Sequence, residues 1–131
     1  MSQKNSAVAR EYFKAIQNGD MATLAKLVDE RIVWHQPGSN RFSGERKGRG
    51  PVFEMIGAMM QLSNGTFAID KLHSVMENGD LVACSLHFVA QREGKSMNME
   101  GVDVLRIENG TIVEAWLFSS DQAAEDDFWG P

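Results

Sequence analysis

The sequence is poor in several features on which whole classes of protein depend. Its single cysteine, Cys84, excludes a disulfide framework or a cysteine-based zinc site within the chain, and a lone thiol suits a reducing cytoplasm. No apolar run approaches the length of a membrane span, and residues 1–17 lack the apolar segment of a signal peptide. Thirteen lysines and arginines face 18 acidic residues, for a net charge of −5. We therefore expect a cytoplasmic protein with neither nucleic acid nor a membrane as its partner.

What remains is the composition of an ordinary globular domain. The chain has 131 residues, of which 43% are hydrophobic and 24% are charged. This is enough chain for one sizeable core. Because no linker, repeat or low-complexity tract divides it, the sequence predicts a single domain over residues 1–131.

The spacing of apolar residues predicts three helices in the first half of the chain. The first runs from about Gln3 to Asn18, Gly19 suits its left-handed end, and Asp20 suits the cap of a second helix over Met21–Val28. A third helix opens near Pro51, because proline is favoured in the first turn. The apolar face of the first helix carries Val8, Tyr12, Phe13 and Ile16.

The second half of the chain alternates with period two, which is typical of strands. Asn-Gly and Glu-Gly pairs separate the segments, and Asn-Gly is a strong hairpin signal. Helices followed by such a meander predict an α+β fold in which one sheet wraps around the helices and leaves a pocket in its mouth. Strands are predicted over about 31–36, 66–76, 81–91, 96–107 and 111–119, with a polar loop over 41–50 and an acidic tail over 121–131.

Asp103 is the most informative residue of the predicted strands. Alternation places it on the same face as Met99 and Leu105, where a carboxylate is costly unless it is paired, hydrogen-bonded or protonated. Pairing with Arg106 or a hydrogen bond to nearby backbone is one interpretation. A functional acid is the other, because perturbed carboxyl groups cluster at active sites.

Three further polar residues stand on otherwise apolar elements and could face the same cavity: Tyr12, His35 and Asp121. With Asp103 they suit proton transfer next to a carbonyl group, with His35 as base and Tyr12 and a protonated Asp103 as hydrogen-bond donors to the developing enolate. Each also has a structural interpretation. Tyr12 is then a core tyrosine, His35 a surface residue at a strand end, and Asp121 the cap of a short tail helix.

Two other sets of residues bear on ligand binding. The three histidines do not have the spacing of a metal site, so no metal and no cofactor are expected. The basic residues of the 41–50 loop either hold an anionic ligand at the rim of a pocket or form a solvated loop. The histidines are His35, His73 and His87, and the basic residues are Arg41, Arg46, Lys47 and Arg49.

Four segments carry a resemblance to a known family: Tyr12–Asp20, Val33–Gly38, Val102–Ile107 and Asn109–Glu114. Together they resemble the SnoaL-like branch of the nuclear transport factor two superfamily. That superfamily includes ketosteroid isomerases, polyketide cyclases, scytalone dehydratases and limonene epoxide hydrolases. The resemblance implies a cystatin-like cone, in which three N-terminal helices pack in a strongly curved, mixed, mostly antiparallel sheet.

The resemblance also implies a ligand pocket and a dimer. A small apolar molecule would lie in the wide end of the cone, against Trp34, Phe53, Met99 and Leu117. Many members form homodimers through the outer face of the sheet. The residues of the last strand that suit such an interface are Ile112, Glu114, Trp116 and Phe118.

Residue by residue, the closest correspondence is to ketosteroid isomerase. Tyr12 matches its tyrosine, eight residues before the aspartate Asp20. Asp103 matches its oxyanion-hole aspartic acid, whose carboxyl group stays protonated in that enzyme and donates a hydrogen bond. The place of its catalytic aspartate is held here by His35, or by Gln36 if the alignment shifts by one residue. A histidine in the role of the base resembles the arrangement in scytalone dehydratase.

Limonene epoxide hydrolases offer a second correspondence. Their two aspartates are similar to Asp103 and Asp121, but the place of their arginine is held by Gly101. The sequence therefore favours a cofactor-independent acid–base enzyme of isomerase, cyclase or dehydratase type that acts on a small apolar carbonyl compound. The alternative is a non-catalytic module of the same fold that binds a small ligand or a protein.

Overall fold

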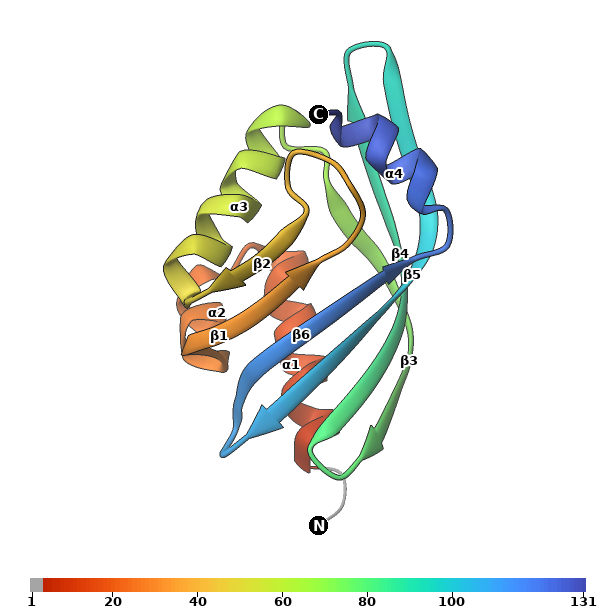
Figure 1. The fold of residues 1–131 in the computed structure, drawn as a ribbon. Helices are drawn as coiled ribbons and strands as arrows, with labels where there is room; N and C mark the ends of the chain where they lie inside the picture. Colours follow the sequence, from red (N-terminus) through yellow and green to blue (C-terminus); the bar gives the residue numbers. More distant parts are fainter. Residues whose placement is uncertain (1–3) are drawn as a thin grey trace.

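A computed structural model describes residues 4–131, in which four helices accompany a six-stranded sheet (Figure 1). The predicted start of the first helix at Gln3 lies outside the described residues. In chain order the elements are α1 (Lys4–Asn18), α2 (Met21–Leu27), β1 (Val28–Gln36), β2 (Gly44–Lys47), α3 (Arg49–Leu62), β3 (Ala68–Asn78), β4 (Leu81–Arg92), β5 (Lys95–Glu108), β6 (Thr111–Ser119) and α4 (Gln122–Trp129).

The sheet has the strand order β2-β1-β6-β5-β4-β3. β1 and β6 are parallel, and every other neighbouring pair is antiparallel, so the predicted mixed and mostly antiparallel sheet is confirmed. The meander β3 to β6 turns at the predicted positions. Between β5 and β6 both Asn109 (φ 52°) and Gly110 (φ 83°) are left-handed, as the favoured two-residue hairpin turn requires.

The first three helices cover one face of this sheet, as Figure 1 shows. On α1 the buried residues Ala9, Tyr12 and Phe13 follow the i, i+3, i+4 spacing of one helix face, and α1 packs against β3, β4 and β5. Gly19 ends α1 with φ 65°, and the carboxylate of Asp20 accepts the backbone N–H of Thr23, so both predicted cap residues are confirmed. The face of the sheet that α1 covers is called the inner face below, and the opposite one the outer face.

Two segments differ from the sequence prediction. The expected loop over residues 41–50 contains β2, which pairs with β1 along the edge of the sheet. Every residue of β2 is charged or glycine, so no apolar alternation marks it, and charge of this kind is common on edge strands. The expected acidic tail contains α4, which gives the cone a fourth helix.

α4 folds back because it has an apolar face of its own. Phe128 and Trp129 are 1% and 0% exposed, and the Trp129 ring meets Phe42, Phe67 and Phe128 edge to face at 4.9–5.4 Å between ring centroids. Aromatic rings prefer this arrangement. The helix α4 therefore packs against both the 37–43 loop and the end of the sheet, as Figure 1 shows.

Candidate functional site

Asp103 lies buried on the inner face of β5, with 6% of its surface exposed. Its partner across the sheet on β4 is Cys84, which is fully buried. Arg106 lies three residues away on the outer face, where its guanidinium binds Glu114 at 2.8 Å. The interpretation of Asp103 as the ion-pair partner of Arg106 is therefore wrong.

Tyr12 and Cys84 share the buried surroundings of Asp103. Tyr12 is only 3% exposed, and burial, followed by the negative charge of Asp103, raises the pKa of its phenol well above the ordinary value. The same two causes raise the pKa of the Cys84 thiol to about 12. Both groups therefore keep their protons at neutral pH, and the Tyr12 hydroxyl is available as a hydrogen-bond donor.

The carboxyl group of Asp103 is poised between its two protonation states. Burial is the main cause and the negative charge of Glu125 the second, and together they raise the pKa of Asp103 to about 7. At neutral pH both the acid and the carboxylate are well populated. A group in this condition can accept and return a proton without a large energetic cost.

Neither oxygen-bearing group has a hydrogen-bond partner in the described part of the chain. Tyr12 and Asp103 are 3% and 6% exposed, and within residues 4–131 no hydrogen bond joins the Tyr12 hydroxyl or the Asp103 carboxyl to another group. The described residues therefore leave the hydrogen-bonding capacity of both groups unused.

Glu125 is a buried acid that the sequence reasoning missed. It is 5% exposed, and its oxygens accept hydrogen bonds from Ser119 Oγ (2.6 Å), Gln122 Nε2 (3.1 Å) and Trp129 Nε1 (3.3 Å). Its position three and four residues before Phe128 and Trp129 was the signal for a buried helix face. The structure thus places a second carboxylate beside Asp103, held in place by three donors.

His35 does not join Tyr12 and Asp103. Its neighbour on β6 is Trp116, whose neighbour on β5 is Val104, so all three side chains share the outer face, opposite Asp103. The imidazole stacks on Trp116 with 5.4 Å between ring centroids and lies 2.7 Å from Glu114 Oε2. The expectation that His35 faces the common cavity is therefore wrong.

Gln36, the alternative for the same position, does point inward. It is 7% exposed, and its side-chain oxygen accepts the indole N–H of Trp34 at 2.9 Å. An amide has no basic site for proton abstraction near neutral pH. On the inner face, the described residues at the end of β1 therefore offer no base.

Asp121 also lies apart from the buried cluster. It is exposed and caps α4, where its carboxylate oxygen accepts the backbone N–H of Ala124 at 3.0 Å. The sequence held this interpretation open beside catalysis. Asp103 and Tyr12 are therefore the two predicted site residues that the structure brings together.

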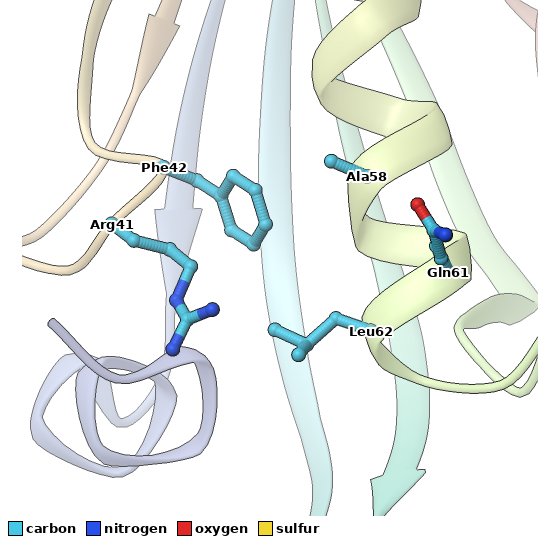
Figure 2. Close-up of a pocket in the computed structure, with 5 residues that line it drawn as sticks. All are labelled: Arg41, Phe42, Ala58, Gln61 and Leu62. Carbon is cyan, nitrogen blue, oxygen red and sulfur yellow. The ribbon is translucent and has the colours of Figure 1, made fainter.

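The four residues expected to line the pocket are all part of the core. Trp34 and Met99 are 5% and 8% exposed, and Phe53 and Leu117 pack against the core while partly buried. A cavity of about 390 Å³ opens elsewhere, between the 41–42 loop and the C-terminal half of α3 (Figure 2). Its lining residues are Arg41, Phe42, Ala58, Gln61 and Leu62.

Gly101 makes the inner face unusually tight two residues before Asp103. A Cβ at this position would lie 2.9 Å from the Phe118 carbonyl oxygen and 2.9 Å from Phe88 Cε1. Both distances are well below ordinary contact. The glycine therefore lets β6 and the Phe88 ring approach β5 next to the buried acid.

The histidines lie on the sheet with separate carboxylates. His73 pairs with Glu100 at 2.8 Å, and His87 with Asp70 at 2.7 Å. Among residues 4–131 no three side chains of His, Cys, Asp or Glu gather as metal ligands would. In the same part of the chain, no helix has both the length and the apolar character needed to cross a membrane.

A curved mixed sheet filled by helices, with a buried acid on its inner face, defines the cystatin-like or nuclear transport factor two-like class of α+β proteins. The chain belongs to the SnoaL-like domain family, whose model matches residues 9–115. No curated protein sequence matches the chain.

Solved structures show the same fold over nearly the whole chain. A Xanthomonas campestris protein of unknown function with a cystatin-like fold is 48% identical, with a TM-score of 0.94 over 97% of this chain and 98% of that one. Bal32a, from a soil-derived mobile gene cassette, is 32% identical, with a TM-score of 0.92 over 98% of each chain. IdmH, a candidate polyketide cyclase from Streptomyces antibioticus, is 21% identical, with a TM-score of 0.74 over 88% of this chain and 91% of that one.

Proposed function

We propose that the protein is a cofactor-independent acid–base enzyme that acts on a small apolar carbonyl compound inside the cone. The observation that carries this proposal is the pair formed by Asp103 and Tyr12, which are buried together on the inner face and make no side-chain hydrogen bond within residues 4–131. Isomerisation, cyclisation and dehydration all begin with the same proton transfer. IdmH is described as a candidate polyketide cyclase, and TerC was crystallised with polyporic acid. Both descriptions add support for small-molecule chemistry in this fold.

The proposed mechanism differs from the sequence expectation in its base. His35 faces the other side of the sheet, so the proton transfer is assigned to Asp103. The Asp103 carboxylate takes a proton from the carbon next to the carbonyl, and the electron pair of that C–H bond moves to form the enolate. Tyr12 donates a hydrogen bond to the enolate oxygen, and protonated Asp103 then returns the proton to carbon.

The experiment is hydrogen–deuterium exchange at carbon, because it needs no knowledge of the product. 1-Tetralone and a panel of other enolisable ketones are incubated in D2O, and loss of the α-proton signal is followed by NMR. We expect acceleration by the protein, with a rate that rises with pH and levels off above about 7, the pKa to which burial raises Asp103. Absence of acceleration with every ketone counts against the proposal.

Two substitutions separate the roles. Asp103→Asn keeps the shape but has no base, so we expect a loss of about 10²–10⁴ in exchange rate. Tyr12→Phe removes the donor and should cost about 10²–10³. His35→Gln is the matched control and should leave the rate unchanged. If Asp103→Asn exchanges as fast as the wild type, the assigned base is wrong.

A non-catalytic binding module is the second candidate, and one observation favours it. The 390 Å³ cavity is lined by residues of the 41–42 loop and α3, and neither Asp103 nor Tyr12 is among them. A ligand held there need not reach the buried acid. Binding of a ketone without any exchange would favour this candidate.

We also propose a homodimer through the outer face of the sheet. Phe118 is 57% and Val102 36% exposed there, next to Trp116, while a register shift between Arg106 and Ile107 turns Ile112 inward, so that it is fully buried. The interface expected from the sequence therefore loses Ile112 and gains Val102. Sedimentation should show a dimer at micromolar concentration that Phe118→Glu dissociates, and a monomeric wild type would contradict it.

A further inference from the structure

The four basic residues of segment 41–49 are in different situations. Arg46 and Arg49 donate to backbone carbonyl groups at 2.5 and 2.6 Å, and Lys47 Nζ lies 3.7 Å from a carboxylate oxygen of Glu45. The guanidinium of Arg41 makes no hydrogen bond or ion pair within residues 4–131. Of the four cations, Arg41 is also the one that lines the cavity.

The cavity has the size and character of a small-molecule site. Its volume of about 390 Å³ lies in the usual range for such sites, about 300–1,000 Å³. Figure 2 shows Phe42 and Leu62 extending into the space between the loop and α3, with Ala58 on the facing helix. The walls are therefore mostly apolar, and Arg41 supplies the charge at one side.

Arg41 is held in place by the C-terminal end of α4. Its backbone N–H donates to the Gly130 carbonyl at 2.8 Å, and the neighbouring Phe42 ring packs on Trp129 at 5.2 Å between centroids. A Cβ on Gly130 would lie 3.3 Å from Arg41 Nη2, so the guanidinium sits directly over this glycine. The backbone that carries the cation is thus fixed, so binding orders the Arg41 side chain alone.

The acid at the neighbouring turn, Asp126, makes no ion pair with Arg41 within residues 4–131. Asp126 accepts hydrogen bonds from the Ser39 backbone (3.0 Å), Asn40 Nδ2 (2.9 Å) and Gln122 Nε2 (3.0 Å). Those donors use its oxygens to fix the 38–40 turn to α4. The guanidinium of Arg41 is left for a group from outside the chain.

We propose that this cavity binds a small, mostly apolar molecule through one carboxylate group, which pairs with Arg41 while the apolar body lies between Phe42 and Leu62. A guanidinium binds a carboxylate with two parallel hydrogen bonds, and this geometry is specific. The net charge of −5 makes the protein as a whole repel anions, so any preference for a carboxylate must arise locally. The site does not depend on the chemistry assigned to Asp103.

The test compares two probes of one shape. Naphthalene-2-carboxylate and naphthalene-2-carboxamide have nearly the same shape and differ mainly in charge, and each molecule is smaller than the cavity. Each is titrated into the full-length protein, and binding is followed by the backbone amide signals in 15N-correlated NMR spectra. We expect shifts in residues 41–43 and 57–62, and an affinity for the carboxylate on the order of tenfold higher than for the carboxamide.

Two variants separate charge from shape. Arg41→Gln should bring the affinity for the carboxylate down to that for the carboxamide and leave the carboxamide unchanged. Ala58→Trp fills the cavity from the exposed face of α3 and should weaken both probes. Lys47→Gln, from the same segment, is the matched control and should alter neither.

The outcomes that overturn the proposal are distinct. Equal affinity for the two probes would remove the role of Arg41, as would unchanged carboxylate binding in Arg41→Gln. Shifts centred on Tyr12 and Asp103 would place the ligand in the buried cluster instead. No binding of either probe at millimolar concentration would mean that the cavity is not a site for this class of molecule.

Discussion

Ionisable side chains are paired and partly exposed on the outer face of the sheet, whereas on the inner face they are buried. On the outer face His35, Glu114, Arg106 and Glu108 form a chain of polar contacts of 2.6–2.8 Å, in which Arg106 pairs with both glutamates, and the four side chains are 19–47% exposed. On the inner face Asp103 is 6% exposed and has no cation beside it among the described residues. Paired, hydrated charges cost the fold little, whereas an unpaired buried acid costs stability and is instead suited to chemistry.

The contributions of the two faces to stability also change with pH in opposite directions. Hydrogen bonding to His35 is the main cause that lowers the pKa of Glu114 below its ordinary 4.5, so its contribution to stability is present above that pH and is lost as the pH falls. Burial raises the pKa of Asp103, so the stability linked to its proton is present at low pH and is lost as the pH rises. Each face can therefore be tested separately.

The largest effect should come from adding one further acid to each face. Leu105→Asp places a carboxylate at a fully buried inner position, and we expect the free energy of unfolding to fall by more than about 4 kcal/mol. Val104→Asp, the neighbouring residue on the half-buried outer face, should cost roughly 1 kcal/mol. Urea denaturation measures both, and equal losses would contradict the difference between the faces.

The second largest effect should be the dependence of the free energy of unfolding on pH that Asp103 causes. Between its ordinary pKa of 3.8 and the raised value of about 7, the folded protein holds a proton that the unfolded chain has released. Raising the pH through this range therefore lowers the free energy of unfolding, by on the order of 4 kcal/mol for about three pKa units.

Asp103→Asn should remove this dependence. The variant and the wild type should be similarly stable near pH 4, and by pH 8 the variant should be more stable by about 2–4 kcal/mol. Urea midpoints at a series of pH values measure the difference. A variant that is less stable than the wild type at pH 8 would show that Asp103 ionises without cost.

A smaller change should follow Glu125→Gln, which removes the second cause of the raised Asp103 pKa. We expect the pKa of Asp103 to fall but to stay above 3.8, because burial is the larger cause. The carboxyl carbon signal of Asp103 in a 13C NMR titration reports it. Asp127→Asn, on the exposed side of α4, is the control and should not move the Asp103 pKa.

The smallest effect should come from the outer ion pairs. Glu114→Gln breaks the contacts to His35 and Arg106 at partly exposed positions, so we expect a small loss in the urea midpoint that disappears in about 1 M salt. A large, salt-independent loss would mean that this face is desolvated, as a tight dimer interface would make it.

The period of apolar residues along the strands and helices was enough to predict which side chains point to the inner face. The alternation of β5 placed Asp103 with Met99 and Leu105, and helical spacing placed Tyr12 on the covered side of α1. These signals succeed because each element is apolar on one face alone. β2 carries no apolar residue, so its pairing with β1 left no such signal.

His35 was assigned to the wrong face for a related reason. Ile32, Val33 and Trp34 are all apolar, so alternation does not say which side of β1 is buried. A shift of one residue moves every side chain of a strand to the other face. The structure shows Trp34 and Gln36 inside, so of the two residues that the resemblance offered for this place, Gln36 is the inward one and His35 is its outward neighbour. Glu125 was missed because the composition of residues 121–131 indicated an acidic tail, although the spacing of Glu125 to Phe128 and Trp129 is that of a buried helix face.

Gly101 bears on which reactions this scaffold can acquire by mutation. An arginine at this position would place a cation two residues before the buried acid. Even the first carbon of that side chain would collide with the Phe118 backbone and the Phe88 ring. Phe88 can be trimmed by a further substitution, whereas the Phe118 carbonyl belongs to the neighbouring strand. A side chain at this position therefore requires β6 itself to move, so the space in front of the buried acid is fixed by the backbone of the sheet.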